Sequence, residues 1–68
     1  MSSVARVTTI TARSEKSFED AIRVGVERST STLRHVRAAW VKEQEVAIGE
    51  DGQITSWEVV LEVTFVLE

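Results

Sequence analysis

The residues of this sequence that are equipped to bind a ligand are one tryptophan and four glutamates in its C-terminal half: Trp40, Glu43, Glu45, Glu58 and Glu62. A tryptophan ring offers a flat apolar surface to planar molecules, and tryptophan is also enriched in the cores of subunit interfaces. Carboxylate oxygens are the ligands that calcium prefers in proteins. These residue types point to binding or assembly as the first functions to test.

Trp40 has the same strand parity as Ala38, and we therefore expect both side chains on one side of a sheet, away from the helix that covers the other side. Two interpretations of Trp40 stay open. It is either an interface anchor between subunits, which we favour, or a displaced stacking surface for a planar ligand.

Glu58 and Glu62 share one face of the last predicted strand and are about 13 Å apart along it. That spacing is too long for the two carboxylates of one chain to act as a pair. We favour a solvated wall over an acidic ring or cation site formed by symmetry copies. Glu43 and Glu45 are further candidate oxygen ligands, but the glutamates make no recognised calcium-binding loop, so the sequence assigns no metal site.

Composition excludes several classes of function. The 68 residues contain no cysteine and one histidine, His35, which removes disulfides, thiolate or histidine metal clusters and cysteine nucleophiles. The hydroxyls from Ser29 to Thr32 have no base nearby in the sequence, so we expect no enzyme. Eight basic and 11 acidic residues give a net charge of −3, which offers no electrostatic reason to bind nucleic acid.

No apolar run approaches the roughly 20 residues that a membrane span needs. The first six residues, which are Met-Ser-Ser-Val-Ala-Arg, lack a signal-peptide core. We therefore expect no membrane partner and a cytoplasmic location.

The stretch from Ile54 to Glu68 alternates apolar and mixed positions with a period of two and predicts one long strand. At about 3.4 Å per residue this strand is roughly 45–50 Å long. A compact monomer of this size has a diameter of only about 28 Å. Something outside the monomer must cover the excess, and oligomerisation is the means of stabilisation left to a small chain without disulfides or metal.

The remaining elements follow in order along the chain. Val4 to Thr11 predicts a first strand, and Ser17 with Asp20 predicts the start of a helix over about 17–33. Val36 to Ile48 predicts a second strand, which the turn residues Gly49 to Gly52 join to the last strand. The sequence thus predicts an α+β fold of order β-α-β-β: one domain, residues 1–68, with a three-stranded antiparallel sheet packed on one helix. On the helix-covered face we expect Trp57, Val59, Leu61, Val63 and Phe65, and we expect Trp57 to belong to the core.

Three segments in this layout resemble the dodecins: Ser17-Phe18-Glu19-Asp20-Ala21-Ile22, Thr32-Leu33-Arg34 and the ending from Leu61 to Glu68. The resemblance covers nearly the whole chain. It implies a hollow homododecamer of cubic symmetry, and a non-enzymatic protein that stores flavins stacked in pairs between tryptophans.

Two departures from the family pattern fall on the flavin site that the resemblance implies. The stacking tryptophan corresponds to Ala38, and the family's glutamine corresponds to Glu58. Alanine offers no aromatic face, and an ionised carboxylate donates no hydrogen bond, so the resemblance implies a degenerate flavin (FMN, riboflavin or FAD) site around Ala38, Trp40 and Glu58. The stretch from Arg37 to Glu45 is more similar to a subset of the family that lacks this tryptophan and is described as calcium-binding. A cation-binding or purely structural shell is the alternative, with Glu43, Glu45 and Glu62 as candidate ligands.

Overall fold

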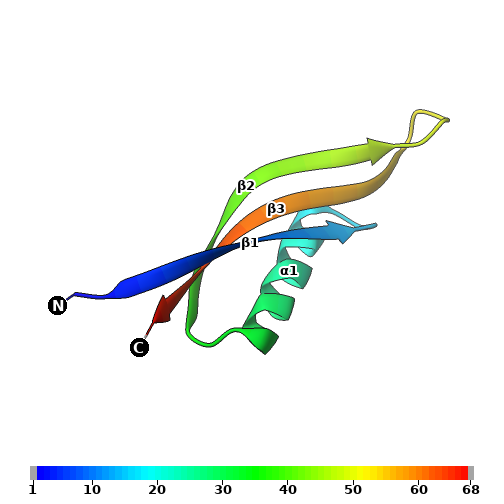
Figure 1. Ribbon diagram of the computed structural model, residues 1–68. Coiled ribbons are helices and arrows are strands. Elements are labelled where there is room, and N and C mark those ends of the chain that lie inside the picture. Colours follow the sequence, from blue (N-terminus) through cyan, green and yellow to red (C-terminus); the bar gives the residue numbers. More distant parts are fainter. Residues whose placement is uncertain (1, 68) are drawn as a thin grey trace.

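A computed structural model describes residues 2–67. The elements, in order, are β1 (Val4–Ser14), α1 (Phe18–Thr32), β2 (Val36–Ile48) and β3 (Ile54–Leu67). The predicted β-α-β-β order is confirmed. The three strands form one antiparallel sheet, and α1 packs against one face of it (Figure 1).

β3 is the central strand, because the sheet order is β1-β3-β2. Leu61 of β3 is paired with Ile10 on one side and with Val41 on the other. A central strand has neighbours on both edges and a helix on one face, which explains why β3 carries the clearest apolar alternation in the sequence.

The molecule is much longer than a compact domain of its size. It measures 54 × 19 × 13 Å, and its radius of gyration of 14.2 Å exceeds the value of about 11 Å expected for a compact domain of this length. α1 has 15 residues and is therefore only about 22 Å long. The β2–β3 hairpin extends beyond the helix at one end, and the start of β1 and the end of β3 lie toward the other (Figure 1). The predicted mismatch between strand length and globule size is confirmed.

The core lies where α1 crosses the middle of the sheet. Val59, Leu61 and Val63 of β3 are almost wholly buried, with exposed fractions of 0, 0 and 1%. Gly25 lets the helix approach this row closely, because a Cβ atom built there would lie 2.8 Å from Leu61 Cδ1. The glycine therefore serves packing, despite its cost of about 1 kcal/mol in helix propensity.

Two sequence predictions differ from the structure. β1 continues to Ser14 instead of ending at Thr11, because its ladder with β3 runs on through Arg13 opposite Glu58 and Ser14 opposite Trp57. Trp57 is only half-buried and lies outside the cluster of buried core residues. α1 is too short to cover the whole of β3, so burial is complete only from Val59 to Val63.

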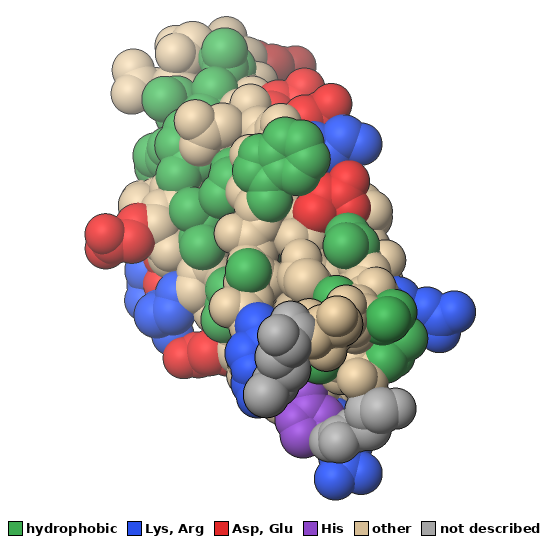
Figure 2. Space-filling model, turned by 90° about the vertical axis from the view of Figure 1, so that its left-hand side faces the viewer, with side chains coloured by type: hydrophobic (Ala, Val, Ile, Leu, Met, Phe, Trp, Pro, Cys, Tyr) green, Lys and Arg blue, Asp and Glu red, His purple; other side chains and the backbone are tan. Residues whose placement is uncertain are grey.

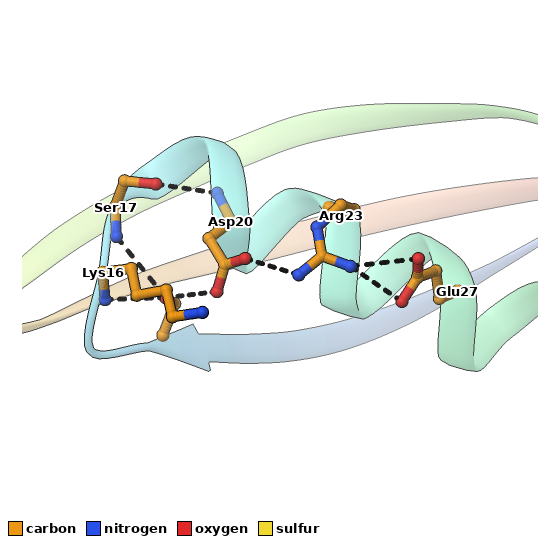
Figure 3. A network of polar contacts seen from close by, with 6 residues as sticks. Lys16, Ser17, Asp20, Arg23 and Glu27 are labelled. Carbon is orange, nitrogen blue, oxygen red and sulfur yellow. Dashed lines mark hydrogen bonds and ion pairs between the residues drawn. The ribbon is translucent and has the colours of Figure 1, made fainter.

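A polar network joins the end of β1 to the start of α1 (Figure 3). The Ser17 hydroxyl caps the helix by accepting from the Asp20 N–H at 2.9 Å. The Ser14 hydroxyl donates to Asp20 Oδ2 at 2.7 Å, and Arg23 Nη2 donates to Asp20 Oδ1 at 2.6 Å. The hydrogen bond from Ser14, followed by that from Arg23, lowers the pKa of Asp20 below its ordinary value of 3.8. Glu27 holds the other end of Arg23 at 3.0 Å.

The burial pattern predicts that Leu61→Ala destabilises the fold more than Val60→Ala, by about 1–3 kcal/mol, because only the first opens a cavity under α1. Urea unfolding of both variants at matched protein concentration measures the difference. Equal losses would mean that the face bearing Val60 is covered just as completely in the assembled protein.

The network around Asp20 predicts an acid-dependent contribution to stability. Because the folded-state pKa is lowered, this contribution is fully present above the ordinary pKa and is lost as the pH falls through the folded-state value. The melting temperature of wild type should therefore exceed that of Asp20→Asn at pH 7, and the difference should shrink as the pH falls below 3.8. Glu27→Gln is the control, because it removes the more exposed partner of Arg23 and leaves the carboxyl group of Asp20 in place. A difference that does not change with pH would contradict the role given to Asp20.

Candidate functional site

The face of the sheet opposite α1, called here the open face, carries all of the predicted site residues. The side chains of Val59, Leu61 and Val63 point to the helix, so their neighbours along β3 point the other way. The ladder pairs then place residues of β1 and β2 on the same face. The open face consists of Val7, Thr9, Thr11, Arg13, Ala38, Trp40, Glu43, Glu45, Ala47, Ser56, Glu58, Val60, Glu62 and Thr64.

A β-bulge in β2 brings Trp40 and Glu43 to this one face although they are three residues apart. Trp40 is opposite Glu62 and Val41 is opposite Leu61, but the register shifts at Lys42 so that Glu43 is opposite Val60. The extra residue reverses the alternation of the strand beyond it. The glutamates of β2 therefore lie beside those of β3.

Trp40 projects from the open face on the same side as Ala38, as the sequence predicts. It is 66% exposed in the single chain. Its ladder partner Glu62 accepts a hydrogen bond from Thr9 Oγ1 at 2.9 Å, and Lys42 Nζ lies 3.5 Å from Glu62 Oε1. The indole thus stands beside a carboxylate that neighbouring side chains hold in place.

Glu58 lies at the centre of a charged row that crosses all three strands. Arg13 of β1 and Glu45 of β2 are its ladder partners, one on each side. Arg13 Nη2 donates to Glu58 Oε2 at 2.7 Å. Two carboxylates directly opposite each other repel, and the guanidinium offsets that repulsion. Glu43, Gln44, Glu45, Glu58 and Val60 line a shallow pocket of about 400 Å³ beside this row.

One protomer does not bring the predicted flavin residues together. Ala38 is opposite Thr64, six residues from Glu58 along β3, which corresponds to about 20 Å. Trp40 is opposite Glu62, four residues from Glu58 and about 13 Å away. The three residues share a face but not a cavity, so a ligand that contacts both ends of the set needs more than one protomer.

The candidate calcium ligands also lie in two separate places on the open face. Glu43 and Glu45 lie with Glu58 at one pocket, whereas Glu62 is engaged by Thr9 and Lys42. Within residues 2–67, no three histidine, aspartate or glutamate side chains are grouped closely enough to hold a metal ion.

Sequence reasoning did not find Arg13 and Lys42 as neighbours of the site. Arg13 was missed because the first strand was predicted to end at Thr11, two residues before it. The alternation of small and β-branched residues around Arg13 is weak, and its partner emerges only from the β1–β3 register. Lys42 became a neighbour of Glu62 through the bulge, which the sequence pattern does not mark.

Large apolar side chains are exposed at both ends of the ribbon. Val4 and Leu67 are paired near the termini with exposed fractions of 66 and 45%, and Ile48 and Ile54 are paired beside the hairpin turn with 66 and 48%. Figure 2 shows apolar side chains at the surface, next to carboxylates. Within residues 2–67 no helix combines the length and apolar character that crossing a bilayer requires.

Comparison with known proteins identifies the family. The sequence model of the family described as Dodecin matches residues 4–68. The chain belongs to the dodecin family. A dodecin from Thermus thermophilus is 40% identical over 68 residues, which cover 100% of this chain and 97% of that protein.

Solved dodecin structures share the fold. The dodecin from Streptomyces davaonensis superimposes with a TM-score of 0.90 at 32% identity, over 100% of this chain and 98% of that one. The calcium-chelating antigen calcium dodecin from Mycobacterium tuberculosis, whose structure has a novel calcium-binding site, superimposes with a TM-score of 0.82 at 33% identity, over 97% of this chain and 93% of that dodecin.

Proposed function

We propose that this chain, acting as a single domain, assembles into a hollow homododecamer that binds and stores a small planar molecule without turning it over. The observation that carries the proposal is the elongated ribbon, whose exposed apolar ends have no cover within one protomer. Exposed apolar patches of this kind are typical of association surfaces. Membership of the dodecin family supports the stoichiometry.

The ligand that we propose is of the flavin family, held at an altered site that involves Ala38, Trp40 and Glu58. All three residues lie on the open face, and Trp40 presents an indole of which two thirds is exposed. Because Ala38 and Glu58 are about 20 Å apart in one protomer, the site would be shared between protomers. Alanine in place of an aromatic ring and a carboxylate in place of an amide both weaken flavin binding.

Calcium binding, or a purely structural shell, is the second candidate. Glu43, Glu45 and Glu58 line one pocket on the open face, and the calcium dodecin of Mycobacterium tuberculosis has a similar fold. Within residues 2–67 no three such side chains lie close enough together to hold a metal ion, so symmetry copies would have to complete a calcium shell of six to eight oxygens.

The proposed assembly predicts a dodecamer at micromolar protein concentration with no populated folded monomer, because the apolar ends need cover from other protomers. Native mass spectrometry at neutral pH measures the stoichiometry. A dominant monomer or dimer would contradict the assembly.

The altered site predicts that wild type binds riboflavin or FMN at least about tenfold more weakly than Ala38→Trp combined with Glu58→Gln, a difference of about 1.4 kcal/mol. The double substitution restores a stacking surface and a hydrogen-bond donor on a backbone that is already in place. Quenching of flavin fluorescence measures both affinities. A triple variant that also carries Trp40→Ala shows whether the native indole occupies the space of the ligand.

Three outcomes of the flavin titration, the third combined with thermal melting in the presence of calcium, separate the candidate functions. Nanomolar flavin binding by wild type would overturn the claim that the site is degenerate. Binding by the triple variant alone would mean that Trp40 fills the pocket. A protein that binds no flavin in any variant, but gains thermal stability with added calcium, would support the second candidate.

A further inference from the structure

The pair formed by Arg13 and Glu58 presents a hydrogen-bonding pattern that differs from that of an amide. An ionised glutamate offers two acceptor oxygens side by side and no donor, whereas a glutamine amide offers one acceptor and two donors. Arg13 Nη2 reaches Glu58 Oε2 at 2.7 Å and brings N–H donors to the same edge. The pair therefore offers two adjacent acceptors flanked by a donor.

Carboxylates predominate around Glu58, and Gln44 and Ser56 are the neutral polar residues that line the pockets beside it. Glu45 lies directly opposite Glu58 in the ladder, and Glu43 lines the same pocket. The Glu58 side chain is 26% exposed, so its carboxylate is reachable from the pocket, while the pairing with Arg13 restricts its orientation. Each carboxylate oxygen has two lone pairs, so Oε2 retains accepting capacity beside Arg13.

The imide edge of a flavin fits this pattern poorly. It consists of one N–H donor between two carbonyl acceptors, so the second oxygen of Glu58 would face a carbonyl. Buried or partly buried polar groups left without a partner carry a large penalty, and sites built on hydrogen bonds discriminate strongly for that reason. A ligand edge that matches the pair has two adjacent donors for the carboxylate and one carbonyl for the guanidinium.

We propose that the Arg13–Glu58 pair makes this site selective for planar heterocycles with a 2-amino-4-oxopyrimidine edge, the edge of pterins and guanines, over the imide edge of flavins. The ring N–H and the exocyclic amine donate to the two oxygens of Glu58, and Arg13 donates to the carbonyl. Arg13 is then a residue that determines specificity. The inference rests on the proposed binding of a small planar molecule, and it makes flavins the weaker ligands of the altered site.

The affinities of the assembled protein for two fluorescent probes test the selectivity. Pterin carries the proposed edge, and lumazine carries the flavin imide edge on the same pteridine ring system. We expect wild type to bind pterin at least about tenfold more tightly than lumazine, and Glu58→Gln to reverse the order. Arg13→Ala should weaken pterin binding severalfold. Glu50→Gln, the same change of charge in the exposed hairpin turn, should leave the ratio of the two affinities within about twofold of wild type.

A second comparison uses wild type alone and does not depend on the folding of a variant. Replacing the pterin amine by a dimethylamine removes its donors, and we expect affinity to fall at least about tenfold. Equal affinities for the two pterins, or a wild type that prefers lumazine, would overturn the proposed selectivity while leaving small-molecule binding intact. A dodecamer that binds neither probe, in wild type or in Ala38→Trp with Glu58→Gln, would overturn both proposals.

Discussion

The contact between Leu61 and the backbone of α1 at Gly25 is the constraint on which the rest of the structure depends. A single methyl group at position 25 would lie 2.8 Å from Leu61 Cδ1, so the helix approaches the sheet as closely as a missing side chain permits. This approach buries Val59, Leu61 and Val63 completely with one short helix. It also determines which face of β3 is apolar, because a strand places successive side chains on opposite faces.

Once the apolar face is fixed, the open face must hold the charged residues of β3 in a sheet only three strands wide. Glu58 and Glu62 sit on the central strand, where side chains of both edge strands flank them. Each forms an ion pair with a residue of a different strand: Glu58 with Arg13 of β1, and Glu62 with Lys42 of β2. Exposed ion pairs of this kind add little to stability, so their main effect is on orientation. Because of these ion pairs, the open face has hydrogen-bond donors and acceptors in defined orientations.

The sequence predicted the features that depend on local chemistry and periodicity. Ser17 caps the helix where predicted, the turn at Gly49–Gly52 joins two long strands, and β3 alternates as its pattern requires. It did not predict features that depend on register. The extension of β1 to Ser14 and the pairing of Arg13 with Glu58 arise from the ladder between distant segments. The incomplete burial of Trp57 depends on where a short helix stops covering a long strand, and no residue near Trp57 encodes that position.

The bulge at Lys42 determines how β2 would respond to the loss of one residue. From Ala38 to Val41 the even-numbered residues lie on the open face, whereas from Glu43 to Ala47 the odd-numbered ones do. Deleting Lys42 would restore simple alternation and keep Glu43 opposite Val60 and Glu45 opposite Glu58, so the carboxylates would stay on the open face. The same deletion elsewhere between Ala38 and Ala47 would move the side chains between it and the bulge to the opposite face. The bulge is therefore the position in this part of β2 where the loss of one residue would change the two faces of the sheet least.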